Sequence, residues 1–130
     1  MVIDASALVA IFPGEPEADR FDAAIGGAQV RLLPATCLLE ARMVLVARRD
    51  ERSLNDLDLW LLKAGVEIMP IDADLVDFAT QAWLIYGRGR HPAGLNFADC
   101  LSYALAKRSG EPLLFKGEDF SRTDLEAVYP

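Results

Sequence analysis

Carboxylate side chains occur at several points of the chain that an α/β fold would bring to one edge of its sheet. Asp4 ends the apolar N-terminal segment, which reads as a buried strand, and Glu118 and Asp119 follow a second apolar segment at residues 112–115. In a parallel sheet, ligands bind beyond the carboxyl ends of the strands. Asp99 is predicted in the first turn of a helix that opens on the same edge, so these acids are expected to meet there.

Glu40 is the acid whose position is hardest to explain, because it interrupts an apolar helical segment. An unpaired carboxylate buried there would cost several kcal/mol. Glu40 could instead pair with Arg42 or Arg48, or reach solvent. Acids gathered at one rim repel each other unless a divalent cation lies among them, and oxygen-only ligation suits Mg²⁺ or Mn²⁺.

The other acids also have ordinary structural explanations. Asp99 lies three residues after Asn96, which is the spacing of a capping box at the start of a helix. Asp4 could cap the helix that follows it, and Asp119 could be a turn residue. Taken together, however, acids at these positions predict a metal site, because functional carboxylates cluster more than structural ones do.

The predicted elements alternate between strands and helices. Strands are predicted at residues 1–4, 29–33, 66–71, 112–115 and, at an edge, 126–129; helices are predicted at 5–11, 16–25, 38–47, 54–64, 73–86 and 97–107, with caps at Ser53 and Asp72. A glycine-rich, basic loop is predicted at residues 87–94, with few side chains that could pack. This order predicts a three-layer α/β/α fold around a central, mainly parallel sheet. The length of 130 residues predicts a single domain over residues 1–130.

Composition narrows the classes of function. The net charge of −7 argues against a broad basic surface for nucleic acid, although carboxylates can meet phosphate through a bound metal. Cys37 and Cys100 stand in apolar sequence without paired spacing, so they are predicted to be buried free thiols. With neither a membrane-length apolar run nor a basic leader, the expected location is cytoplasmic, with no membrane contact.

Four features of the sequence follow one another in an order known from one family. They are residues 1–8 (MVIDASAL), the isolated Glu40, residues 95–100 (LNFADC) and residues 113–120 (LLFKGEDF). Together they resemble the PIN-domain ribonucleases and, more narrowly, the VapC toxins of type II toxin–antitoxin pairs. The resemblance covers the whole chain, although Ala5 stands where many relatives have threonine.

The resemblance implies a PIN-like fold and a Mg²⁺-dependent endoribonuclease that hydrolyses the phosphodiester bonds of RNA. It implies that Asp4 and Asp99 contact the metal directly, and that Glu40 acts through metal-bound water or a second ion. Relatives often carry two aspartates at the fourth position, where this chain has Glu118 followed by Asp119, and Asp119 is favoured. The only histidine lies in the predicted loop and is not well placed as a general base. This position fits hydrolysis by a metal-activated water.

Further residues receive supporting roles. Ser6 matches the small hydroxyl residue of the family and could steady a metal-bound water or a phosphate. Arg88 and Arg90 precede Asp99 in the basic loop and could contact RNA phosphates beside the cut, or could simply be solvated. Trp83 lies on an apolar helical face and is predicted to belong to the core or an interface.

Protein partners are predicted from the apolar surface of one helix and from the family resemblance. The helix at residues 37–47 is apolar nearly all round, so we expect its surplus surface, with the helix at 54–62, to pack against another chain. The family suggests both a homodimer and a cognate VapB-like antitoxin, and an acidic toxin suits a basic antitoxin tail.

Two rival interpretations remain at this level. One is a catalytically silent interaction module with the same fold. The other is a receiver-type phosphotransfer domain, which would need a phospho-accepting aspartate at the end of a middle strand; residues 66–71 end without one.

Overall fold

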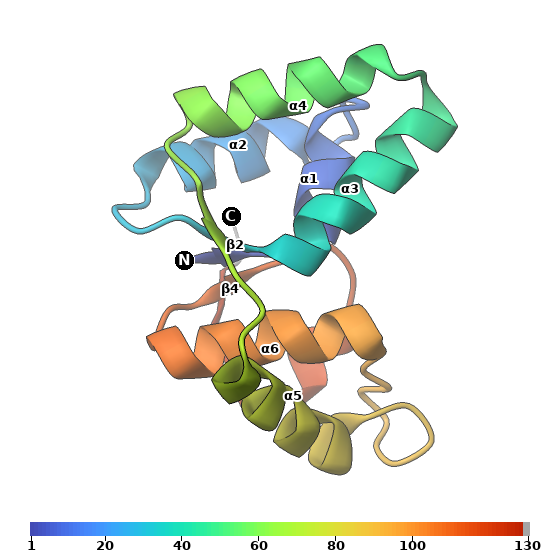
Figure 1. Cartoon of the computed structure of the whole chain (residues 1–130), viewed down its shortest axis with the longest axis vertical. Helices are drawn as coiled ribbons and strands as arrows, with labels where there is room; N and C mark the ends of the chain where they lie inside the picture. The colour runs from blue at the N-terminus through green and yellow to red at the C-terminus, as the bar shows by residue number, and fades with distance from the viewer. Residues whose placement is uncertain (129–130) are drawn as a thin grey trace.

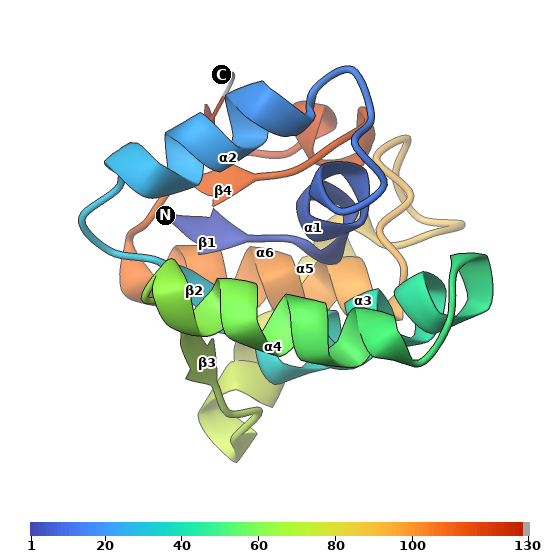
Figure 2. The same ribbon diagram turned by 90° about the horizontal axis from the view of Figure 1, so that it is seen from above.

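The strands form one parallel sheet in the order β3-β2-β1-β4-β5. The computed structural model describes residues 1–128, and Figure 2 shows four of the strands in succession from β4 to β3. The strands are β1 (Val2–Ile3), β2 (Leu32–Pro34), β3 (Glu67–Met69), β4 (Leu113–Leu114) and β5 (Ala127–Val128). The strand predicted at 126–129 is observed as β5 at Ala127–Val128, with residue 126 just before it, and Tyr129 lies outside the described residues. The predicted α/β class with a parallel central sheet is confirmed.

Helices cover both faces of this sheet, as Figure 1 shows. The elements are α1 (Ala5–Ile11), α2 (Ala18–Gly27), α3 (Ala35–Arg48), α4 (Arg52–Lys63), α5 (Ala73–Tyr86), α6 (Phe97–Ser109) and the short 3-10 helix η1 (Asp119–Arg122). Helices α1 to α4 lie on one face, and α5 and α6 lie on the other. Within residues 1–128, no helix combines the length and the apolar character needed to cross a bilayer.

The two faces of the sheet follow from the alternation of side chains along each strand. Val2 of β1 and Leu113 of β4 belong to the buried cluster under α5 and α6. Their neighbours Ile3 and Leu114 belong to the cluster under α1 to α4. The central strands β1 and β4 are completely buried because helices cover both faces of the sheet, which explains their continuous apolar sequence.

Helix α6 begins and ends as its sequence predicts. The side chain of Asn96 accepts a hydrogen bond from the backbone N–H of Asp99 at 2.9 Å, and Asp99 Oδ2 accepts one from the N–H of Asn96 at 2.9 Å. The capping box is therefore complete. At the other end, Gly110 has a φ of 70°, a left-handed conformation that glycine adopts without a steric penalty.

Three predicted helix starts are shifted in the structure. Helix α3 begins at Ala35, three residues before the predicted start at residue 38. Helix α4 begins at Arg52, and Ser53 is a buried residue inside the helix rather than its cap. The N-cap is Glu51, whose side chain makes no capping hydrogen bond, and the Oδ1 of Asp50 before it accepts a hydrogen bond from the N–H of Arg52 at 2.8 Å. Helix α2 begins at Ala18, and Pro16 lies in the turn before it.

The loop between α5 and α6 packs more closely than its composition suggests. Gly87 and Leu95 form a β-bridge across its base. The Arg90 guanidinium lies 4.1 Å from the centre of the Trp83 ring. A Cβ on Gly87 would stand 2.4 Å from the carbonyl oxygen of Trp83, so only glycine fits there. The loop is therefore held against the last turns of α5.

Candidate active site

The candidate site lies at the carboxyl edge of the sheet, between β1 and β4. These two strands are neighbours, yet the chain visits β2 and β3 on one side of β1 before it crosses to β4 on the other. Such a reversal of strand order opens a crevice at the carboxyl ends of the strands. Asp4 directly follows β1, and its N–H donates to the carbonyl of Leu114 in β4 at 2.9 Å.

Asp4 is a buried acid, with 6% of its surface exposed. Its Oδ2 accepts hydrogen bonds from the backbone N–H of Ser6 at 3.0 Å and from the Ser6 hydroxyl at 2.6 Å. Its Oδ1 accepts a hydrogen bond from the hydroxyl of Ser102 at 2.7 Å. Asp4 therefore does cap α1, as one alternative proposed, and its carboxylate is bound on both oxygens.

Ser6 also links the two strands that flank the site. Its hydroxyl donates to Asp4 and accepts a hydrogen bond from the backbone N–H of Lys116 at 3.0 Å. The hydroxyl group thus ties the start of α1 to the segment after β4. This geometry supports a role for Ser6 in fixing Asp4, alongside the predicted contact with water or phosphate.

Asp99 faces the other predicted acids from the first turn of α6. Burial raises the pKa of its carboxyl to about 6, and the negative charges of Asp4, Asp119 and Glu40 add to this increase. The hydrogen bond from the N–H of Asn96 works in the opposite direction. The fold thus brings Asp4, Asp119 and Glu40 close enough to Asp99 for their charges to act on its carboxyl.

The side chain of Glu40 is exposed, so of the explanations that the sequence left open, contact with solvent is the one observed. The arginines considered as partners bind elsewhere: Arg42 pairs with Asp58 at 2.7 Å, and Arg48 with Glu15 at 3.5 Å. Partial desolvation and the charge of Asp4 nevertheless raise the pKa of the Glu40 carboxyl. Glu40 is therefore an acid at the rim of the site, open to water on its outer side.

Glu118 and Asp119 are both exposed at the start of η1. Asp119 contributes to the raised pKa of Asp99, whereas Glu118 is not among the groups that shift it. The backbone carbonyl of Glu118 accepts hydrogen bonds from the N–H and hydroxyl of Ser121, which fixes the turn. This arrangement favours Asp119 as the fourth acid of the site.

The acids form an open arrangement rather than a finished cage. Within residues 1–128, no three Asp, Glu, His or Cys side chains stand in position to hold one metal ion. The ion pairs described in the same residues involve other acids. Mg²⁺ is commonly bound through one or two carboxylates, with waters and substrate phosphates completing its shell. Clustered carboxylates without a cationic partner fit that mode of binding.

Two residues of this region were missed as functional candidates by sequence reasoning. Ser102 is completely buried in α6 and donates to Asp4, and the Sγ of Cys37 lies 3.1 Å from the Ser102 hydroxyl oxygen. Burial and the charge of Asp4 raise the pKa of the Cys37 thiol far above its usual range. Cys37 and Cys100 are buried free thiols, as predicted. The only sequence signal for Ser102 was a polar residue one turn after Asp99 in an apolar helix.

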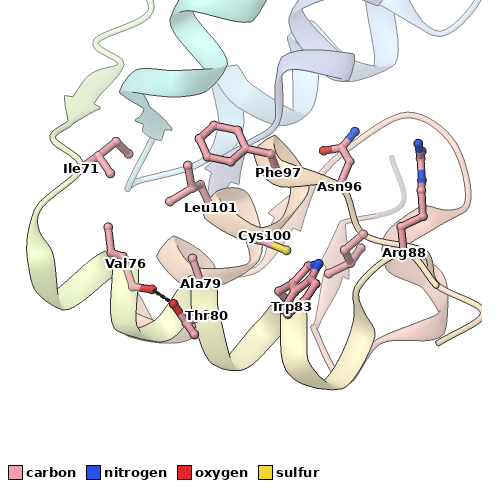
Figure 3. A pocket seen from close by; sticks show the side chains of 11 residues that line it. Ile71, Val76, Ala79, Thr80, Trp83, Arg88, Asn96, Phe97, Cys100 and Leu101 are labelled. Carbon is pink, nitrogen blue, oxygen red and sulfur yellow. Dashed lines mark hydrogen bonds between the residues drawn. The ribbon is translucent and has the colours of Figure 1, made fainter. Parts of the chain in front are cut away.

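An apolar groove of about 500 Å³ adjoins the site on the side of α5 and α6 (Figure 3). Trp83, Phe97 and Leu101 are among the residues that line it, and Arg88 lies at the same end as Asn96. No carboxylate lines this groove, so it is not the candidate catalytic centre. Its apolar walls are suited to a partner rather than to a metal.

The pKa of Asp99 leads to a prediction about stability. Because the pKa is about 6 in the folded protein and 3.8 ordinarily, the folded state retains a proton that the unfolded chain has released between these values. This contribution to stability is complete below pH 4 and lost as the pH rises through 6. In EDTA at pH 7, Asp99→Asn should therefore be more stable than the wild type by about 1 kcal/mol, after allowance for partial solvent screening.

Urea unfolding at pH 5 and pH 7 measures this difference. The advantage of Asp99→Asn should shrink at pH 5, and the control Asp77→Asn, an exposed acid on α5, should show no such trend. Equal pH dependence in the wild type and in Asp99→Asn would contradict the interpretation.

Known proteins resemble this chain over nearly its whole length. The PIN domain family model matches residues 1–126. The ribonuclease VapC30 of Mycobacterium tuberculosis is 52% identical over 98% of both chains, and a ribonuclease VapC of Mycolicibacterium smegmatis is 50% identical over 99% of this chain and 100% of that protein.

A solved structure agrees in fold. The M. tuberculosis toxin VapC20, described as cleaving the sarcin–ricin loop, superposes with a TM-score of 0.80 at 23% identity, covering 99% of this chain and 98% of that one. The identities and coverage place the sequence within one group of proteins. The chain belongs to the PIN domain family and, within it, to the VapC ribonucleases.

Proposed function

We propose that this protein is the toxin of a toxin–antitoxin pair and cleaves RNA as a Mg²⁺-dependent endoribonuclease. The observation that carries the proposal is the convergence of Asp4, Glu40 and Asp119 on Asp99 at the carboxyl edge of the sheet, where their charges add to the raised pKa of the Asp99 carboxyl. Relatives at 50% and 52% identity are named ribonucleases, which supports the same reaction class.

Asp4 and Asp99 are the residues proposed to hold the ion. A carboxylate-held Mg²⁺ supplies Lewis-acid chemistry, since it polarises a phosphodiester and lowers the pKa of a water. Asp4 presents a carboxylate that its hydrogen bonds hold in one orientation. Asp99 presents one that is bound on Oδ2. The negative charge that the two bring together favours a divalent cation such as Mg²⁺ or Mn²⁺.

Glu40 and His91 differ in their suitability as proton acceptors. Glu40 is exposed at the rim with a raised pKa, so it is suited to take the proton that an attacking water releases. His91 is occupied inside the loop, where its Nδ1 accepts a hydrogen bond from the N–H of Ala93 at 3.1 Å and its ring packs edge-on against Tyr86. We therefore propose hydrolysis without a histidine base.

The first test is cleavage of total RNA by the purified protein, free of antitoxin. We expect discrete products in Mg²⁺, none in EDTA, and at least about a 100-fold loss in Asp4→Asn and Asp99→Asn, because a lost ligand should exceed the 10- to 100-fold effect of an outer-shell change. Asp77→Asn, with its exposed acid on α5, is the matched control.

The same assay compares the adjacent acids at η1. Asp119→Asn should lose more activity than Glu118→Gln, since Asp119 is the one of these two acids whose charge raises the pKa of Asp99. Folded wild-type protein with no Mg²⁺-dependent products would favour the silent interaction module.

Arg88 and Arg90 are proposed to contact RNA phosphates. Both are exposed, and Arg90 is held over Trp83. The double variant Arg88→Ala with Arg90→Ala should raise KM several-fold with little change in kcat, and the effect should shrink as salt screens the phosphates. Kinetics at low and physiological salt measure this, with Lys63→Ala at the far end of α4 as control. Unchanged cleavage at both salt concentrations would remove the proposed contact.

Two apolar surfaces are available for the proposed protein partners. On the α3–α4 face, Leu39 is 60% exposed and Met43 is 63% exposed. Glu40 lies beside Leu39 on that face, so a partner bound there could extend a basic segment to the acids. We assign this face to the antitoxin, consistent with the predicted surplus surface of these helices.

The α5–α6 groove is then left for a second copy of the chain. Phe97 at its rim is 79% exposed, which is unusual for an aromatic side chain without a partner. If the groove is the dimer interface, the wild type should sediment as a dimer and Phe97→Asp as a monomer. Met43→Asp, on the other face, should remain dimeric. A monomeric wild type, or dissociation of Met43→Asp instead, would contradict this assignment.

A further inference from the structure

Three buried polar side chains meet beneath the acids of the site. The Ser102 hydroxyl donates to Asp4 Oδ1 at 2.7 Å, and the Cys37 Sγ lies 3.1 Å from the Ser102 oxygen and 3.7 Å from Asp4 Oδ1. Ser102 and Cys37 have no exposed surface, and Asp4 has 6%. We call these three side chains the hub.

Each member of the hub comes from a different element that carries an acid of the site. Ser102 lies three residues after Asp99 in α6, and Cys37 lies three residues before Glu40 in α3. Residues three apart lie on the same side of a helix, one turn from each other. Ser102 and Cys37, the buried residues of the two helices, therefore meet at Asp4. Asp99 and Glu40, one turn away on the same helices, provide the acids of the site.

The direction of the hydrogen bonds follows from the groups involved. A carboxylate only accepts, so the Ser102 hydroxyl must donate to Asp4. The Ser102 oxygen can then accept from the Cys37 thiol, and a chain of such bonds strengthens each member. The hub thereby fixes the positions of α3 and α6 relative to the end of β1.

We propose that Ser102 and Cys37 are positioning residues that set the separation of the carboxylates of Asp4, Asp99 and Glu40. This inference rests on the proposed function for its consequence in catalysis, but its direct effect is on metal binding. Neither residue contacts the substrate or the metal; both act through Asp4 and through the helices that carry the other acids.

A purely structural role for Ser102 would appear in stability alone. Removing the hydroxyl takes one donor from the buried Asp4 carboxylate, so Ser102→Ala should lose stability in either case. The positioning role predicts that metal binding weakens as well, because groups that orient metal-binding carboxylates typically contribute 10- to 100-fold to affinity.

The test is a titration of the purified protein with Mn²⁺, followed by electron paramagnetic resonance, together with urea unfolding. Ser102→Ala should bind Mn²⁺ about tenfold more weakly than the wild type. Ser53→Ala, which removes another buried serine hydroxyl in α4, should bind as the wild type does. A second pair of variants tests Cys37. Cys37→Ala should weaken Mn²⁺ binding, and Cys37→Ser, which retains a hydrogen-bond donor, should bind Mn²⁺ almost as the wild type does.

The outcomes separate the hub from the proposed function. Mn²⁺ binding by Ser102→Ala as tight as that by Ser53→Ala overturns the hub, even if the wild type cleaves RNA. Weakened binding in Ser102→Ala supports the hub, even if the wild type cleaves nothing. If Ser102→Ala does not fold, the Cys37 pair decides: equal affinities in Cys37→Ala and Cys37→Ser overturn the proposal, and a difference in the expected direction supports it.

Discussion

The burial of the Asp4 carboxylate is the constraint on which the rest of the site depends. A carboxylate withdrawn from water is costly unless donors replace the lost solvent. Here the donors are the backbone and hydroxyl of Ser6 at the start of α1 and the hydroxyl of Ser102 in the middle of α6. The packing of α6 against the sheet is thus what supplies Asp4 with the hydrogen bond from Ser102. The same packing brings Asp99 to the rim of the site.

Repulsion among the acids is the second constraint. Burial is the largest cause of the raised pKa values of Asp99 and Glu40, and the charges of neighbouring carboxylates raise these values further. Two features of the start of α6 reduce the cost for Asp99: the hydrogen bond from Asn96 and the positive end of the helix dipole. The capping acid and the proposed site acid are therefore the same residue, and the two explanations of Asp99 do not exclude each other.

The sequence predicted what depends on local rules. The strand ending at Asp4 and the caps of α6 follow from apolar periodicity and from the chemistry of Asn96. The hub could not be predicted, because Ser102 and Asp4 are 98 residues apart and a serine inside an apolar helix has no special local signature. The sequence also left three explanations of Glu40 open, namely burial, an arginine partner and exposure to solvent, and only the packing of α3 decides for solvent.

The two proposed metal ligands differ in the number of lone-pair positions that remain free on their carboxylate oxygens. A carboxylate has about four lone-pair positions. Asp4 already accepts three hydrogen bonds and lies 3.7 Å from the Cys37 thiol, so it has room for one further bond at most. Within residues 1–128, Asp99 accepts one described hydrogen bond, on Oδ2, which leaves its Oδ1 available. Asp4 is thus suited to fix where an ion sits, and Asp99 is suited to adjust to its coordination shell. That division explains why the more rigid acid is the buried one, and why the acid with the raised pKa stands at the accessible end of a helix.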